Sequence, residues 1–327
     1  MSDSLAITLA DVESAASQIR GIAVRTPLLE YAALNAAVGA RTLLKFEGAQ
    51  HAGSFKFRGA YNRLSRIAAS AKSAGVVAWS SGNHAQGVAA AAKMLGMPAT
   101  IVMPSDAPAI KIANTRALGA EIILYDRQSE SREAIATELA KRRGATLVPS
   151  YDDPFIIAGQ GTIGLEMLDQ AREAGVAMGR VLVCCGGGGL VAGIATAIRS
   201  KTPEIAVYCV EPSAFDDTAR SLASGRRESV AKGAQSICDA LLAPAPGELT
   251  FPINKALLAG GFAVSDDEVR AAMRFAFDTL KLVIEPGGAV ALAAALHNLA
   301  PAGEGALAVV VSGANVDPEV YARILIE

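Results

Sequence analysis

The sequence has few of the residues that mark secreted, membrane-bound or metal-rich proteins. Its 327 residues include four cysteines and three histidines, and no C-x-x-C pair occurs. This scattered set argues against a disulfide framework and against a histidine-based metal cage. No apolar run reaches the roughly 18 residues of a membrane helix, and segment 1–21 lacks the basic stretch and apolar core of a signal peptide. We therefore expect a cytoplasmic protein whose cysteines are buried and reduced.

The chain also lacks an excess of charge of one sign. Lys and Arg number 30 against 32 Asp and Glu, so the formal net charge is −2, and no long basic run is present. Nucleic-acid binding needs clustered Lys and Arg against phosphates, so we expect neither a nucleic-acid nor a membrane partner. Hydrophobic residues make up 51% of the chain and charged residues 19%, which is typical of a folded enzyme with a large core.

Short apolar segments alternate with helical patterns along most of the chain. The expected strands are 76–80, 100–103, 121–125, 181–185, 206–210 and 307–311, and the expected helices include 87–95, 110–118, 131–143, 190–200 and 266–280. Continuous apolar strands between helices indicate parallel sheets that are covered on both faces. We therefore predict an α/β fold of two open, twisted, mostly parallel sheets with flanking helices.

The strands and helices fall into two groups, which predict two domains. The loop 149–154 separates the first group from the second. A small domain of residues 71–151, inserted into a large domain of residues 1–70 and 152–327, would explain this order. A cleft between two such domains is a usual place for a ligand.

An unbroken run of four glycines, Gly186–Gly189, lies between the expected strand 181–185 and the expected helix 190–200. In this arrangement backbone N–H groups and a helix N-terminus can hold a phosphate, which a side chain would block. The segment also fits the dinucleotide fingerprint Gly187-x-Gly189-x-x-Ala192, with Glu211 after the next strand. On this segment alone, a dinucleotide and a smaller phosphate cofactor are both open.

Two further motifs favour the smaller cofactor. Lys56 stands among small and aromatic residues in 54–57 (SFKF), and a polar turn, 80–84 (SSGNH), follows an expected strand. A lysine in such a setting suits Schiff-base chemistry, and the N–H groups of a turn that opens a helix suit a carboxylate. A dinucleotide enzyme needs neither element. A pyridoxal phosphate enzyme needs a lysine, a phosphate cup and groups that hold the ring and the substrate.

Six motifs, taken in order, resemble the fold-type II pyridoxal phosphate enzymes, which are tryptophan synthase β-like, and in particular their serine/threonine dehydratase and serine racemase branch. The motifs are 53–60 (GSFKFRGA), 80–87 (SSGNHAQG), the Gly186–Gly189 loop, 211–217 (EPSAFDD), 284–288 (IEPGG) and 312–315 (SGAN). The resemblance implies pyridoxal 5'-phosphate in an interdomain cleft, an amino acid as substrate and a homodimer as the assembly.

The resemblance also implies roles for single residues. The implied cofactor-binding residues are Phe55, Lys56, Asn83, Gly186, Gly187, Gly188, Gly189, Glu285 and Ser312. Lys56 would carry the cofactor as a Schiff base and, once the substrate displaces it, would remove the Cα proton. Ser312 would face the ring nitrogen. A hydroxyl there makes the ring a weaker electron sink than a carboxylate partner does, which suits prompt loss of a β-substituent.

The substrate-binding residues that the resemblance implies are Ser80, Ser81, Asn83, His84 and Arg132. Ser81 would be a second catalytic residue, because the matching serine of racemases protonates Cα from the face opposite the lysine. Arg132 falls where hydroxyaspartate-using relatives carry an arginine, which could clamp a second carboxylate. The alternatives are an ordinary helix cap for the 80–84 turn and a surface position for Arg132.

The acidic segment 211–217 resembles the divalent-cation site of racemase-like members. Its ligands would be Glu211, the carbonyl of Phe215 and Asp217, and such oxygen ligands suit Mg²⁺, Ca²⁺ or Mn²⁺. A helix start capped at Asp216 or Asp217 is the alternative.

The resemblance predicts a pyridoxal phosphate ammonia-lyase. By β-elimination it would convert L-threonine, L-serine or 3-hydroxyaspartate to a 2-oxo acid and ammonia. A serine or aspartate racemase on the same site is the alternative. The chain departs from related racemases in segment 239–247 (DALLAPAPG), which lacks the serine that helps those enzymes bind the substrate carboxylate.

Overall fold

The computed structural model describes residues 5–107 and 109–326 and contains two β-sheets flanked by helices. The large sheet has the strand order β1-β2-β10-β7-β8-β9, and the small sheet has the order β5-β4-β3-β6. Strands pair in parallel throughout, except that β1 is antiparallel to β2. The predicted fold class is therefore confirmed.

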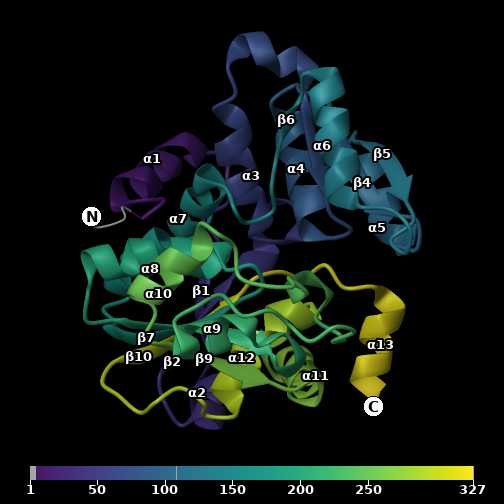
Figure 1. Cartoon of the computed structure of the whole chain (residues 1–327). Coiled ribbons are helices and arrows are strands. Elements are labelled where there is room, and N and C mark those ends of the chain that lie inside the picture. The colour runs from purple at the N-terminus through teal and green to yellow at the C-terminus, as the bar shows by residue number, and fades with distance from the viewer. Residues whose placement is uncertain (1–4, 108, 327) are drawn as a thin grey trace.

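Figure 1 shows the small sheet and its helices above the large sheet. The strands are β1 (Leu28–Glu30), β2 (Thr42–Phe46), β3 (Val76–Trp79), β4 (Ala99–Pro104), β5 (Glu121–Tyr125), β6 (Thr146–Leu147), β7 (Met178–Cys184), β8 (Ala206–Pro212), β9 (Gly260–Val264) and β10 (Ala306–Val311). The helices are α1 (Leu9–Ile19), α2 (Ala32–Val38), α3 (Lys56–Ser65), α4 (Asn83–Met94), α5 (Ala109–Ala117), α6 (Arg132–Arg143), α7 (Pro154–Glu173), α8 (Gly189–Lys201), α9 (Asp217–Ser224), α10 (Thr250–Leu257), α11 (Asp266–Phe275), α12 (Pro286–Leu296) and α13 (Pro318–Ile326).

Local sequence signals explain where several helices begin. α7 has Pro154 at its first position, and the side chain of Asp153 before it accepts a hydrogen bond from the N–H of Phe155 at 2.8 Å. α11 follows Ser265, which forms a reciprocal capping box with Glu268. Such caps satisfy backbone N–H groups that have no partner inside the helix.

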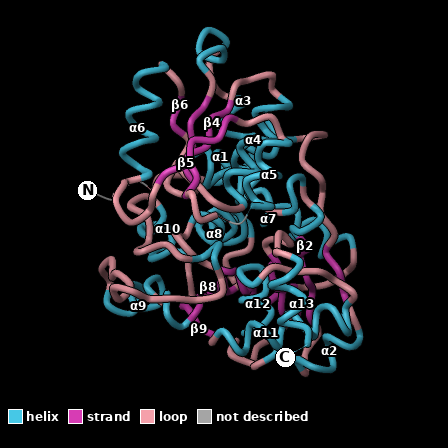
Figure 2. The backbone as a smooth tube through the Cα atoms, turned by 90° about the vertical axis from the view of Figure 1, so that its right-hand side faces the viewer, coloured by secondary structure: helices cyan, strands magenta, loops and turns pink. Residues whose placement is uncertain are grey.

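Each sheet has its own apolar core. Around the large sheet, strands β7 and β10 pack against α12, whose residues 286–295 are all buried. Around the small sheet, the alanines of α4 pack against Ile101 and Met103 of β4. Between the two sheets lies α7, which contacts α1, α3 and α8, and Figure 2 shows α7 and α8 at this height. The geometry at α7 therefore sets how the elements on either side of it are spaced.

The structure contains the six expected strands, each within a few residues of its expected ends, and also β1, β2, β6 and β9. The sequence pattern hid β9 because it begins with Gly260 and Gly261, and glycine usually interrupts strands. The expected helix 266–280 is α11 followed by a π-helical turn, Ala276–Leu280. The expected helix 87–95 is the later part of α4. The division into domains 71–151 and 1–70 with 152–327 stays a prediction.

The four cysteines are free and buried, as expected. Among the helices of the described ranges, none combines the length and the apolar character that crossing a membrane requires.

Candidate active site

A cavity of about 150 Å³ lies where the carboxyl ends of β7 and β10 face the small sheet. In parallel α/β sheets this is the usual edge for a ligand. The cavity brings together residues that are far apart in the sequence. Of the predicted site residues, those that line it are Phe55, Lys56, Ser80, Asn83, His84, Arg132, Gly186, Gly187, Gly188, Gly189 and Ser312.

Lys56 is the first residue of α3, and its amine points into the cavity. Two backbone contacts hold the segment before it: the N–H of Phe55 donates to the carbonyl of Ser312 at 3.0 Å, and Ser54 forms a β-bridge with Gly313. The Nζ of Lys56 donates to the carbonyl of Ser150 at 2.7 Å and lies 5.2 Å from the centre of the Phe55 ring. Burial lowers the pKa of this amine to about 8.

The Gly186–Gly189 loop joins β7 to the N-terminus of α8. A Cβ on Gly187 would lie 2.4 Å from the ring of Tyr151, so no side chain fits there. From outside the cavity, Thr250 Oγ1 donates to the carbonyl of Gly187 at 2.6 Å. Because the C=O and N–H of a trans peptide point in opposite directions, the next N–H group turns toward the cavity. The loop therefore presents backbone donors at a helix N-terminus.

Asn83 is held in one orientation by its neighbours. Its Nδ2 donates to Glu285 Oε1 at 2.6 Å, and its Oδ1 accepts from Asn315 Nδ2 at 2.8 Å. Burial raises the pKa of Glu285 to about 8, so this carboxyl is mostly protonated at neutral pH. Glu285 thus contacts the cavity through Asn83 and does not line it directly.

The 80–84 turn joins β3 to α4. Ser80 Oγ accepts a hydrogen bond from the N–H of Gly82 at 3.1 Å. His84 Nε2 lies 2.9 Å from the carbonyl of Val148, and burial lowers the pKa of His84 to about 3, so the ring is neutral. Ser81 lines an adjoining outer cavity of about 490 Å³ but not the inner one. The structure therefore brings every predicted residue of this turn except Ser81 to the inner cavity.

Arg132 begins α6 and lines both the inner and the outer cavity. Its Nε pairs with Glu133 Oε1 at 2.8 Å, and 46% of its side chain is exposed. The guanidinium is therefore within reach of a ligand but already has a carboxylate partner.

Sequence reasoning missed several cavity residues. Ser150 supplies the carbonyl that Lys56 contacts, and Tyr151 packs its ring over the glycine loop. Both lie in the loop 149–154, which the sequence marked only as a connection. Cys184 also lines the cavity, and burial raises the pKa of its thiol to about 11. Only the position of these residues at the junction of the two expected domains could have singled them out.

Glu211 and Asp217 form a buried acidic pair at the end of β8 and the start of α9. The carboxylate of Glu211 accepts from the N–H groups of Thr218 at 3.0 Å and Ala219 at 2.8 Å. Asp217 Oδ2 is buried and has no hydrogen-bond partner within the described ranges. Burial first, and then the charge of Asp217, raises the pKa of Glu211 to about 8, and burial raises that of Asp217 to about 7.

Phe215 ends a 3₁₀ turn, Ser213–Phe215, between these two acids. Across residues 5–107 and 109–326, no group of three or more His, Cys, Asp or Glu side chains is arranged to hold a metal. A cation at this pair would therefore depend on backbone carbonyls and water for its other ligands.

Comparison with known proteins gives similarities over nearly the full chain. Residues 19–313 match the family described as pyridoxal-phosphate dependent enzyme. The chain is 45% identical over 316 residues to L-threo-3-hydroxyaspartate ammonia-lyase from a Pseudomonas species, covering 96% of this chain and 97% of that protein. It is 39% identical over 326 residues to serine racemase from Schizosaccharomyces pombe, covering 99% of each.

A solved structure is similar in fold as well as in sequence. The threonine deaminase whose source is abbreviated T.th. superposes with a TM-score of 0.90 at 43% identity, covering 95% of this chain and 99% of that one. The similarity confirms the predicted fold-type II arrangement.

Proposed function

This chain belongs to the family of pyridoxal-phosphate dependent enzymes, and from this premise we propose that it is an ammonia-lyase acting on a β-hydroxy amino acid. The substrates that we propose are 3-hydroxyaspartate, L-threonine and L-serine. One observation carries the proposal: the amine of Lys56 shares a cavity with the Gly186–Gly189 loop and Ser312. The names of the hydroxyaspartate ammonia-lyase and of the threonine deaminase support the reaction class.

The cavity residues fit pyridoxal 5'-phosphate. The loop 186–189 has no room for side chains and offers backbone N–H groups for a phosphate. Ser312 supplies a neutral hydroxyl for the ring nitrogen, Asn83 an oriented amide for the ring hydroxyl, and Phe55 an aromatic face near Lys56. When bound, the cofactor supplies the electron sink that stabilises negative charge at Cα.

Lys56 is the group that we propose as the base. With a pKa of about 8, a useful fraction of its amine is uncharged near neutral pH. Its hydrogen bond to Ser150 holds the nitrogen at the cavity wall. From that position an uncharged amine can remove the Cα proton.

The elimination breaks the Cα–H and Cβ–O bonds and releases the β-hydroxyl as water. The product leaves as an enamine, and its hydrolysis consumes a water molecule and yields the 2-oxo acid and ammonia. Glu285 and His84 are largely uncharged near neutral pH, as their pKa values of about 8 and about 3 indicate. Together with Ser312, they keep the surroundings of the ring close to neutral, which suits prompt loss of the β-hydroxyl.

The substrate α-carboxylate would bind at the N-terminus of α4, at Ser80, Asn83 and the neutral His84. A second carboxylate would bind Arg132, which would exchange Glu133 for the substrate. This role of Arg132 favours 3-hydroxyaspartate over serine and threonine.

Racemisation of serine or aspartate is the second candidate, and the similarity to serine racemase favours it. It would need Ser81 to protonate Cα from the side opposite Lys56. Ser81 lines the outer cavity, so the racemase reaction would require the 80–84 turn to move inward. Elimination requires no such movement.

The buried acidic pair supports a divalent cation at Glu211, the carbonyl of Phe215 and Asp217. Raised pKa values and an unpartnered Asp217 Oδ2 are what a carboxylate pair shows without its cation. All three ligands are oxygens, so we propose Mg²⁺, with Ca²⁺ or Mn²⁺ as substitutes.

We also propose a homodimer. The exposed side chains of Phe277 and Val283, at 42% and 44%, offer apolar surface for a second copy. Sedimentation equilibrium of the purified protein tests this assembly directly.

A substrate panel tests the reaction. Holoenzyme given L-serine, L-threonine and 3-hydroxyaspartate should release ammonia and a 2-oxo acid in equal amounts, and Lys56→Ala should abolish both. Inverted amino acid without ammonia would mean that the protein is a racemase. A colourless protein that gains no borohydride-reducible absorbance with added pyridoxal 5'-phosphate would refute the cofactor assignment.

Arg132→Ala tests the choice of substrate. We expect it to lower kcat/KM for 3-hydroxyaspartate by about a hundredfold while changing that for serine by less than about threefold, because a charge-assisted bidentate contact contributes about 1.5–3 kcal/mol. The matched control is Arg127→Ala, which removes a neighbouring arginine that pairs with Asp106 and does not line the inner cavity. Equal losses for the two substrates would reject the clamp.

A further inference from the structure

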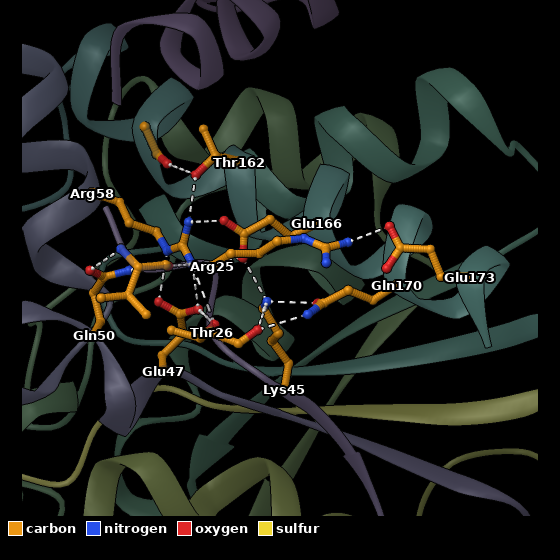
Figure 3. Close-up of polar contacts among 12 residues, drawn as sticks. Arg25, Thr26, Lys45, Glu47, Gln50, Arg58, Thr162, Glu166, Gln170 and Glu173 are labelled. Atoms are coloured by element: carbon orange, nitrogen blue, oxygen red, sulfur yellow. Dashed lines mark hydrogen bonds and ion pairs between the residues drawn. The ribbon is translucent and has the colours of Figure 1, made fainter. Parts of the chain in front are cut away.

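A buried network of charged side chains lies directly behind Lys56, as Figure 3 shows. Arg58, two residues further along α3, is fully buried. Its Nε donates to Glu47 Oε2 at 2.8 Å, its Nη1 to Glu166 Oε1 at 2.6 Å, and its Nη2 to both Glu47 Oε1 and Glu166 Oε2 at 2.9 Å. The planar guanidinium is therefore gripped by two carboxylates in a fixed plane.

Lys45 of β2 completes this Arg58 network, which consists of Arg58, Lys45, Glu47 and Glu166. The Nζ of Lys45 donates to Glu166 Oε2 at 2.7 Å, to the carbonyl of Thr26 at 2.7 Å and to Gln170 Oε1 at 2.9 Å. Two cations balance two carboxylates. Burial alone would raise the pKa of Glu166, but Arg58 and Lys45 outweigh it and hold that pKa below its usual value.

The network ties together three elements that define the cavity. Arg58 is on α3, which begins with Lys56, and Glu166 is on α7. On one side, α7 meets α3 at backbone contact, because a Cβ on Gly159 would lie 2.6 Å from the Cα of Gly59.

On its other side, α7 meets α8 equally closely, since a Cβ on Gly193 would lie 2.6 Å from the N of Gly161. α8 begins at Gly189, the last residue of the glycine loop. Thus α7 separates the helix that carries the lysine from the helix that follows the phosphate loop.

We propose that Glu166, acting through Arg58, is a positioning residue for Lys56. The two-carboxylate grip fixes the direction of the first turn of α3 against α7, and the backbone bond from Phe55 to Ser312 fixes the chain just before it. Between these two restraints the amine of Lys56 is held at one distance from the glycine loop. Neither Arg58 nor Glu166 lines the cavity, so both act only through α3. The inference rests on the proposed function, because it assumes the role of Lys56.

Glu166→Gln and Glu173→Gln form a matched pair that tests the proposal. Both glutamates are on α7 and both pair with arginine, but Glu173 and its partner Arg25 are more than half exposed, whereas Arg58 is fully buried. Each variant would be measured for non-covalent binding of pyridoxal 5'-phosphate by equilibrium dialysis. Borohydride trapping of the cofactor on Lys56 would then be followed by mass spectrometry.

We expect Glu166→Gln to bind the cofactor within about threefold of the wild type, because the loop on α8 is intact. Trapping on Lys56 and kcat should both fall by about tenfold to a hundredfold, since misplacing a reacting group by about 1 Å costs that much. KM should change little. Glu173→Gln should behave as the wild type in all four measurements. Glu166→Asp, which keeps the charge but withdraws the carboxylate by one methylene, should show the same split between binding and trapping.

Two results would overturn the proposal. Wild-type trapping in both Glu166 variants would show that the network does not set the position of Lys56. Parallel loss of binding, trapping and circular-dichroism signal in both would show that it only maintains the fold. Failure of the proposed function looks different, because the wild type itself would then trap no cofactor on Lys56.

Discussion

Two buried clusters of charged side chains differ in how their charges are balanced. In the Arg58 network, two carboxylates face two cations, and the pKa of Glu166 is held below its usual value. In the acidic pair, Glu211 and Asp217 are equally buried, but their pKa values rise to about 8 and about 7. Burial acts in the same direction in both, so the partners make the difference.

The difference separates a structural use of buried charge from a binding use. A balanced cluster is complete within the chain and can hold helices in a fixed relation. An unbalanced one holds protons or a cation to offset its charge. The first therefore points to positioning, and the second to a ligand that the chain does not itself supply.

The largest expected effect comes from unbalancing the Arg58 network. Arg58→Met removes the guanidinium and leaves Glu47 and Glu166 facing only Lys45 in a dry site. We expect the free energy of unfolding in urea to fall by about 3–5 kcal/mol, the usual result of breaking a buried ion pair from one side. The control is Arg25→Met, whose exposed pair with Glu173 should contribute less than about 1 kcal/mol. Similar losses in the two variants would mean that the network is not specially balanced.

A smaller effect, of opposite sign, is expected at the acidic pair. In cation-free protein the pKa of Asp217 rises from 3.8 to about 7 on folding. Between these values the folded state holds a proton that the unfolded chain has lost, so stability falls as pH rises through this window. Asp217→Asn removes that loss. Relative to the wild type in EDTA, the variant should gain about 1–3 kcal/mol at pH 7.5 and nothing at pH 3.5.

Thermal unfolding at several pH values measures this gain, and the comparison with the wild type cancels the opposite contribution of His84, whose pKa falls on folding. Millimolar Mg²⁺ should raise the melting temperature of the wild type at pH 7.5 but not that of Asp217→Asn. A wild-type protein that is indifferent to Mg²⁺, Ca²⁺ and Mn²⁺ would remove the cation from this site.

The same contrast explains which parts of the fold could be predicted. Strands made of continuous apolar residues, such as β7 and β10, gave an unambiguous signal and were found. β2 carries Lys45 in its middle, and a buried lysine in a strand has no signal in the sequence until its partners are known. Those partners, such as Glu166, are more than a hundred residues away. Balance between distant charges is therefore a property of the folded chain alone.

The candidate site divides in a similar way. Lys56, the glycine loop and Ser312 were predictable because each stands in a motif with its own local chemistry. Ser150 and Tyr151 contribute a backbone carbonyl and a ring face, for which no residue pattern is required. Ser81 was expected beside Lys56, and its place in the outer cavity depends on how the turn between β3 and α4 is oriented.

The smallest perturbation sharpens the comparison without changing any residue. Lys45 and Lys56 are both buried amines with lowered pKa values, but Lys45 has Glu166 as partner, whereas the only hydrogen bond of the Lys56 amine within the described ranges is to a carbonyl. In cofactor-free protein, acetylation of Lys56 should therefore follow a midpoint near pH 8 instead of 10.5. Lys45 should stay unmodified until the protein unfolds. Mass spectrometry of the labelled peptides reads both sites, and the exposed Lys93 reports reagent activity in the same sample. A midpoint for Lys56 near 10.5 would mean that its amine is solvated, and the proposed base would then lack the uncharged fraction that it needs at neutral pH.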